Sequence, residues 1–426
     1  MFKGRKECKP IAEVEGMIGE MDEYFNVEIG LCRTAMRFYG IWPKERNFAV
    51  YIRFVILLTV VMGFCNIPQT VKLFKVKNDF DELLEIITNC NLAVMMSVLK
   101  TVSFWRNYKA LGWLADAMAK DWTTAMTEME RKITRKTAKL SRSITIIMLW
   151  SVESAVFSFL IVNSYYRWKE SQLFEQGKIN ASERVRPLYM KAEFPYDIQR
   201  TPYYEITWIL QFLSTLFSSS TFSLIDGFFS TLVLHLCAQL RNLRGQLKRR
   251  LAEAARSKDN PDSALNLSAV VERHEFLMRF AQTIEDIFNL PFLVQLLSSI
   301  LIFCLCSYQI VKVITSDVVF LLDLVFAVYY YISVAASLFV YCLIATLLST
   351  ESTKMRETAY NSEWYELSPA DARPLILIMI RTQQPLEFTA GKFVAFSLEL
   401  YCSVLKTSVG YLSVLLAMKD TLQADS

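Results

Sequence analysis

Long apolar stretches separated by charged connections dominate the pattern of this chain. A helix that crosses a bilayer needs about 20 mainly apolar residues, and seven stretches approach or exceed that length. We therefore predict an all-α membrane protein with seven transmembrane helices, and the expected spans are 49–67, 83–104, 143–163, 203–236, 291–313, 318–348 and 393–418. A helix at 374–380 is too short to cross, so the seventh helix is expected to be split.

The composition supports this class and argues against several others. Of the 426 residues, 53% are hydrophobic, which is too apolar for an ordinary soluble domain. The net charge of +4 is small and the basic residues are clustered, so no nucleic-acid partner is indicated. The sequence contains no phosphate-binding loop or nucleophile elbow, and His235 and His274 have no spacing partners for zinc. We expect no enzymatic activity, no cofactor and no metal.

The distribution of Lys and Arg sets the expected orientation, because basic loops stay in the cytosol. The connections 105–142 and 237–290 carry nine basic residues each, whereas 68–82 on the opposite side carries three. The segment 1–48 is therefore expected in the cytosol, and the tail 419–426 outside.

The same orientation gives opposite predictions for two glycosylation sequons. Asn180 lies in the long loop after the third span, which is expected outside, so it can carry a glycan. Asn266 lies in the connection before the fifth span, which is expected in the cytosol, so it should stay bare.

Several segments are expected to extend beyond the membrane into the cytosol. The spans 203–236 and 318–348 are longer than a bilayer requires, and a helical pattern at 270–289 precedes the fifth span. Together with 349–392, these segments are predicted to form a cytosolic anchor region. The basic cluster at 131–142 is expected in a loop directly before the third span.

The last helix carries an edge of ionisable and polar residues. Lys392, Glu399, Lys406 and Ser413 recur every seven residues, which keeps them near one edge because seven residues make about two turns. Ionisable groups at membrane depth are costly and turn toward protein or water. This edge therefore either docks the helix through an ion pair or faces an aqueous path.

Other polar groups lie inside or beside the predicted spans. Glu153, Asp226 and Asp323 are interpreted as buried hydrogen-bonding or interface groups rather than ion sites, and Lys100 lies near one end of the second span. The Ser/Thr run 214–223 is expected to allow close helix packing.

Two blocks of the sequence resemble one known family. The first block closely resembles the C-terminal signature of the insect odorant receptors, and the second resembles the same family. The first comprises Trp364–Leu367, Leu375–Phe393, Ser397–Glu399 and Val404–Tyr411, and the second comprises Glu193–Asp197, Pro202–Ile206, Gln211, Asp226, His235–Leu236 and Gln239–Leu240. Together they cover roughly a third of the chain.

The resemblance implies a non-selective cation channel that odorants open, with subunits assembled around one pore through the cytosolic anchor. Thr407, Tyr411, Val414 and Met418 share one face of the last helix, and the resemblance places Val414 and Met418 at the gate. Such faces around an axis would form a narrow apolar constriction, which can gate ion flow by dewetting.

Two residues depart from the family's shared co-receptor. Ala417 stands where the co-receptor has glutamine, and Gly410 stands where it has threonine. The resemblance therefore implies an odour-tuned subunit that forms a heterotetramer with the co-receptor in the plasma membrane of olfactory sensory neurons.

The resemblance also implies a site for a small volatile organic ligand in the outer halves of spans two, three, four and six. Such a ligand needs an apolar, aromatic cavity with a few orienting polar groups. The candidates are Tyr330, Tyr329, Phe326, Phe212, Ile209, Leu213, Phe157, Ser154, Ser158, Ile87 and Asn91. An aromatic stripe such as that on 326–330 is more often helix packing than a pocket, so Tyr329 and Tyr330 rank first and the residues of span two rank last.

Two other functions fit a polytopic membrane protein. A metabotropic receptor coupled to G proteins is the main alternative, although its usual Asp-Arg-Tyr motif after span three and its Asn-Pro motif in span seven are missing. A transporter predicts internal repeats, and the sequence shows none.

Overall fold

The computed structural model describes residue 26 and residues 28–76, 80–124, 126–178, 185–256, 267–315, 321–362, 364–367 and 369–424. Nearly all of this part of the chain is helical. After a helical stretch at 28–39 come α2 (Phe48–Val61), η1 (Met62–Asn66), α3 (Ile67–Lys75), α4 (Phe80–Ile86), η2 (Ile87–Asn91), α5 (Leu92–Arg106), α6 (Tyr108–Thr123), α7 (Glu128–Glu175), α8 (Tyr203–Arg256), α9 (Ser268–Thr315), α10 (Leu321–Tyr360), η3 (Trp364–Glu366), α11 (Pro369–Arg381), β1 (Thr389–Ala390), β2 (Val394–Ala395) and α12 (Leu398–Ala424).

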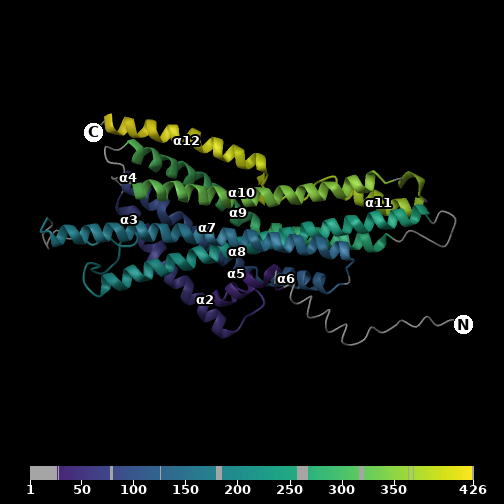
Figure 1. The fold of residues 1–426 in the computed structure, drawn as a ribbon, viewed down its shortest axis with the longest axis horizontal. Helices are drawn as coiled ribbons and strands as arrows, with labels where there is room; N and C mark the ends of the chain where they lie inside the picture. Colours follow the sequence, from purple (N-terminus) through teal and green to yellow (C-terminus); the bar gives the residue numbers. More distant parts are fainter. Residues whose placement is uncertain are drawn as a thin grey trace.

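Four long helices, α7, α8, α9 and α10, run along the length of the molecule (Figure 1). One end of this bundle, here called the anchor end, holds α11 and the C-terminal ends of α8 and α10. The opposite end, here called the far end, holds α3, α4 and the C-terminal end of α12. Helix α8 lies in the centre, and its most apolar 18-residue segment is 94% buried.

Five helices in the described part of the chain are long and apolar enough to cross a membrane: Phe48–Lys75, Glu128–Glu175, Tyr203–Glu253, Ser268–Thr315 and Leu321–Tyr360. The predicted second and seventh spans are not among them. The second is divided into α4, η2 and α5. The seventh forms most of α12, whose side chains are described as far as Ser413.

Close packing of α7 against α8 depends on small residues. Thr145 Oγ1 lies 3.4 Å from the Gly227 carbonyl, and Ser141 Oγ lies 2.7 Å from Thr231 Oγ1. A Cβ atom at Gly227 would come within 2.5 Å of Thr145 Cγ2. Small residues let helix backbones approach in this way.

Gly227→Ala is expected to destabilise the protein by about 1–3 kcal/mol, because the added methyl group overpacks the contact with Thr145. The change would appear as a lower thermal midpoint of the purified protein in detergent. Thr145→Ala in the same chain should recover part of the loss. Gly112→Ala, where a Cβ would meet no atom within 4 Å, is the control. An unchanged midpoint for Gly227→Ala would contradict the packing described here.

Several helix boundaries differ from the sequence prediction. The basic cluster 131–142 is not in a loop, because α7 begins at Glu128 with a capping box formed by Thr127 and Glu130 and continues unbroken to Glu175. The short helix predicted at 374–380 is α11, which begins at Pro369.

The last helix begins later than predicted. The sequence predicts residues 393–397 in the seventh helix, but β2 occupies Val394–Ala395 and pairs with β1, and α12 begins at Leu398. The tight turn between the strands is formed by Gly391 and Lys392, which have φ values of 60° and 64°. Helix α12 also continues to Ala424, beyond the predicted end at Met418.

Charged side chains join the helices at the anchor end. Glu351 on α10 is buried, and it pairs with Arg241 (3.1 Å) and Arg244 (3.1 Å) on α8 and with Lys354 (3.3 Å). The carboxylate is thereby compensated by three cations, as a buried charge requires. The contact fixes α8 against α10.

A second charged cluster lies around His235. Its Nδ1 is 3.2 Å from Glu28 Oε1 and its Nε2 is 3.1 Å from Asp121 Oδ2, so only the doubly protonated ring can donate to both carboxylates. Arg273 also contacts Asp121 at 2.7 Å. Burial disfavours the charged form of Asp121, but hydrogen bonds from His235 and Arg273 outweigh burial and hold its pKa below the usual range. The cluster ties α6, α8 and α9 to the stretch 28–39.

A candidate ligand cavity between five helices

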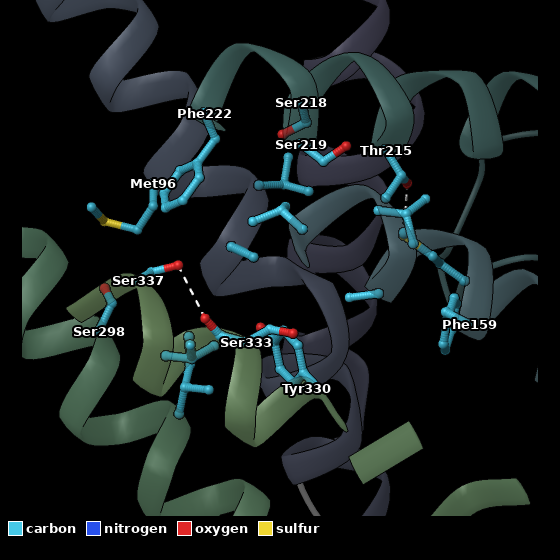
Figure 2. Close-up of a pocket in the computed structure, with 18 of the residues that line it drawn as sticks. Met96, Phe159, Thr215, Ser218, Ser219, Phe222, Ser298, Tyr330, Ser333 and Ser337 are labelled. Carbon is cyan, nitrogen blue, oxygen red and sulfur yellow. Dashed lines mark hydrogen bonds between the residues drawn. The ribbon is translucent and has the colours of Figure 1, made fainter. Parts of the chain in front are cut away.

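A cavity of about 130 Å³ lies among α5, α7, α8, α9 and α10 (Figure 2). The lining residues belong to the half of the bundle toward the far end. Residues 189–190 of the loop before α8 also line it. The lining is mainly apolar with several hydroxyl groups and one amide, and it consists of Ala93, Val94, Met96, Val152, Ala155, Val156, Phe159, Tyr189, Met190, Thr215, Ser218, Ser219, Phe222, Gln295, Ser298, Ile302, Phe326, Tyr330, Ser333, Val334 and Ser337.

Aromatic rings form one wall of the cavity. The ring centroids of Phe159 and Phe326 are 5.2 Å apart, and those of Phe326 and Tyr330 are 6.0 Å apart with the rings nearly parallel. Tyr189 packs edge-on against Phe159 at 5.1 Å. Rings at these separations are in contact with one another. The cavity lies beside them.

The loop segment that covers the cavity is held by hydrogen bonds to α7 and α8. Gln211 accepts a hydrogen bond from the Met190 N–H at 3.2 Å and donates one to the Met190 carbonyl at 3.3 Å. Asn163 donates to the Leu188 carbonyl at 2.8 Å. Because the backbone on both sides of Tyr189 is bonded, the segment forms a fixed wall of the cavity.

Polar side chains line the α8, α9 and α10 sides. Ser218 and Ser219 come from α8, and Ser298, Ser333 and Ser337 come from α9 and α10 (Figure 2). A few polar groups in an apolar cavity are typical of small-molecule sites, where they orient the ligand.

A buried ion pair lies directly beneath the cavity, toward the anchor end. Lys100 Nζ on α5 is 2.7 Å from Asp226 Oδ1 on α8 and 3.1 Å from the Tyr341 hydroxyl on α10. The ammonium also lies 3.7 Å from the ring centroid of Phe222, which lines the cavity. Both charged side chains are almost completely buried, at 2% and 1% exposure.

An aromatic cluster continues from this ion pair to the base of α12. Phe292 lies 5.3 Å from Tyr341 and 5.4 Å from Phe396, between ring centroids. Phe229 lies 4.6 Å from Phe292 and 5.5 Å from Phe388. Phe388 and Phe396 flank the hairpin that precedes α12, so contacts run without interruption from the cavity floor to that helix.

Comparison with known proteins decides the family. The sequence model of the family described as 7tm Odorant receptor matches residues 82–409. This chain belongs to that family. It is therefore a multi-pass membrane protein of a receptor family and not an enzyme.

The odorant receptor is similar in sequence to odorant receptor 13a of Drosophila melanogaster, with 28% identity over 248 residues that cover 54% of this chain and 57% of the relative. It is also similar to the odorant receptor coreceptor of Aedes aegypti, with 29% identity over 149 residues that cover 35% of this chain and 30% of the relative. The match thus spans little more than half the length of the first relative.

The fold is that of a solved insect receptor. The insect olfactory receptor OR5 from Machilis hrabei, determined in complex with eugenol, superposes with a TM-score of 0.75 at 18% identity. The superposition covers 93% of this chain and all of the solved chain. The predicted all-α fold of a seven-helix odorant receptor is confirmed by this likeness together with the family match.

In this odorant receptor the predicted ligand residues lie in different surroundings. Phe326 and Tyr330 line the cavity. Phe212 packs behind the wall, 5.6 Å from Tyr189. Tyr329 hydrogen-bonds to Ser154 between α7 and α10 and does not line the cavity.

The remaining predicted ligand residues lie outside the cavity lining. Phe157 and Ile209 are about half exposed on the outer surface of the helices. Ser158 bonds to the Ala155 carbonyl, and Asn91 bonds to Thr70 on α3. Leu213 and Ile87 are partly buried and contribute nothing to the lining.

The Ser/Thr run of α8 is the signal that could have found part of the lining. The sequence predicts a packing role for 214–223, but Thr215, Ser218, Ser219 and Phe222 also face the cavity. The run serves both purposes, because its other face packs on α7.

The acidic residues predicted inside the spans are hydrogen-bonded. Glu153 accepts hydrogen bonds from Ser219 and Ser220, and Asp323 accepts one from Tyr166.

Helix α12 packs on α9 and α10 through one face. Val404 and Ser408 on that face are buried. The residues predicted for the charged edge and the pore, Glu399, Lys406, Thr407 and Tyr411, are all exposed. The side chains of Val414 and Met418 lie outside the described residues, as does Asn180.

Proposed function

We propose that this odorant receptor is the odorant-binding subunit of a heteromeric, ligand-gated, non-selective cation channel. A volatile organic molecule binds in the cavity among α5, α7, α8, α9 and α10, and α12 lines the pore. The observation that carries the proposal is the mainly apolar cavity with several hydroxyl groups among the five helices, connected through Lys100 and packed aromatic residues to the base of α12.

The exposed side of α12 supports a pore in an assembly of several subunits. Glu399 and Lys406 are exposed in the described part of this chain. Facing them to lipid would be costly, so we propose that this side meets sibling subunits and water. Thr407 and Tyr411 then lie toward the shared axis, with Val414 and Met418 at the gate.

We propose the family's co-receptor as the partner in a heterotetramer. The similarity to odorant receptor coreceptors, over 149 residues and 35% of this chain, supports a shared mode of assembly. The anchor end lies in the cytosol and Asn180 lies outside in this proposal, and the complex is placed in the plasma membrane of olfactory sensory neurons.

Gating follows from a difference in affinity between two arrangements of the helices. An odorant that fits the open arrangement better than the closed one shifts the population toward it. The contacts from Phe222 through Lys100 and Tyr341 to Phe396 provide a packed route by which a change in the cavity can bias α12.

Coexpression with a co-receptor is the direct test of this function. Cells that express both chains should give cation currents to members of a panel of volatile compounds, and cells that express the co-receptor alone should not give the same currents. An identical response profile with and without this chain would contradict a ligand-binding role.

Tyr330→Ala is expected to change the order of preference among odorants, because it removes a ring from the cavity wall. Half-maximal concentrations for good ligands should change by about tenfold, in line with the loss of one well-packed aromatic contact. The measurement is a set of dose–response curves in coexpressing cells. The matched control is Tyr331→Ala, whose ring packs 5.1 Å from Phe303 outside the cavity. Equal effects of the two variants would remove the support for this cavity.

A further inference from the structure

One amide at the inner side of the cavity has an acceptor without a partner. Gln295 on α9 lines the cavity and is 93% buried, with a relative exposure of 7%. Its Nε2 donates to Ser299 Oγ at 3.3 Å, but its Oε1 has no hydrogen-bond partner. A buried polar atom left unpaired is costly and uncommon in native proteins. The atom therefore marks a place where a ligand donor would be stabilised.

The bonded hydroxyl groups around the cavity have already committed their protons. Ser333 donates to the Tyr329 carbonyl and Ser337 donates to the Ser333 carbonyl, both at 3.0 Å. Thr215 donates to the Gln211 carbonyl, and Ser219 donates to Glu153. These groups present lone pairs to the cavity and no free proton. Ser218 and Ser298 can rotate to donate or accept.

We infer that the cavity selects small alcohols and phenols, with the ligand hydroxyl donating to Gln295 Oε1. This inference rests on the proposed function and specifies its ligand class. The hydrocarbon part of the ligand lies toward Phe159, Phe326 and Tyr330, and the hydroxyl lies toward the floor. The cavity of about 130 Å³ is similar to an apolar protein cavity of about 150 Å³ that accepts benzene, so a ligand with one ring or a short chain fits.

Isomeric pairs of compounds test this inference directly. Benzyl alcohol and anisole are isomers that differ in the presence of a hydroxyl donor, as are n-hexanol and methyl pentyl ether. In cells expressing this chain with a co-receptor, the alcohol of each pair should act at about tenfold lower concentration than the ether, because one hydrogen bond to a buried acceptor contributes roughly that factor.

Gln295→Leu should abolish this preference while responses to the ethers persist or increase. Gln295→Met is a second variant of similar volume, and Gln282→Leu, an exposed position on the same helix, is the control that should keep the preference. Two results would overturn the inference. In the first, the wild-type receptor does not distinguish the isomers, which is expected if a water molecule donates to Gln295 Oε1. In the second, Gln295→Leu and Gln295→Met both preserve the wild-type ratio of half-maximal concentrations for ether and alcohol.

A binding measurement separates this inference from the proposed channel function. Each alcohol should raise the thermal midpoint of the purified wild-type protein more than its ether does, and Gln295→Leu should remove the difference. Stabilisation without any evoked current would support the ligand class and contradict the channel. Evoked currents with no preference for the alcohol would support the channel and contradict the ligand class.

Discussion

Asp226→Ala is expected to destabilise this odorant receptor by about 3–5 kcal/mol, the largest effect among the substitutions considered. The substitution leaves the Lys100 ammonium almost completely buried without its carboxylate partner, which lies 2.7 Å away in the intact protein. The Tyr341 hydroxyl and the Phe222 ring contact the ammonium but carry no compensating charge. The measurement is the thermal midpoint of the purified protein, read by size-exclusion chromatography after heating.

A double substitution distinguishes loss of the partner from loss of the pair. Lys100→Met combined with Asp226→Leu replaces both charges by apolar side chains of similar volume, and such replacements are often neutral or stabilising. We expect the double variant to be far closer to the wild type than Asp226→Ala. If the double variant were as unstable as the sum of the single ones, the interpretation of a compensated buried pair would be wrong.

Gly391→Ala is expected to destabilise the base of α12 by about 2–4 kcal/mol. Gly391 has a φ of 60°, a conformation that costs a side-chain-bearing residue about 1–2 kcal/mol. A Cβ at this position would also lie 2.6 Å from Leu293 Cδ2 and 3.1 Å from Leu293 Cβ on α9, which adds overpacking. Because the Gly391 N–H donates to the Asn289 carbonyl at 2.8 Å, the turn cannot move away without losing that bond.

The effect of Gly391→Ala should extend to the channel current, since the turn sets the position of α12 against α9. Maximal odorant-evoked current per receptor at the cell surface is the functional measurement, with thermal midpoint as the structural one. Gly177→Ala is the matched control, because Gly177 has a φ of 68° but open space around a Cβ. If both variants behaved alike, backbone strain alone would account for the result and contact with Leu293 would have no part in it.

The sequence predicts the long helices well because their apolar stretches are far longer than any competing structure would need. The sequence predicts less well where a helix begins, because that depends on a few neighbouring residues. The basic residues 131–142 look like a loop by charge, yet Thr127 and Glu130 cap a helix there and Glu130 also pairs with Arg249 on α8. Residues 393–397 look like the start of an apolar helix, yet the turn at Gly391 directs them into a hairpin.

The ligand cavity is harder to predict than the fold, because lining depends on which face of each helix turns inward. Phe326 and Tyr330 share the inward face of α10, whereas Tyr329 is rotated away and meets Ser154. Gln295 is absent from the predicted site, although Ser298 and Ser299 follow it at i+3 and i+4 and form a polar stripe with it in an otherwise apolar span. Lys100 and Asp226 are distant in sequence, so their pairing becomes visible only in the folded chain.

The most direct measurement of the central claim is a recording from excised membrane patches of cells that express this chain with a co-receptor, bathed without nucleotides on the cytosolic side. The account predicts that a volatile ligand evokes cation current at once under these conditions, because cavity and pore belong to one complex. A current that appears only when GTP is supplied would contradict it and would indicate a metabotropic receptor.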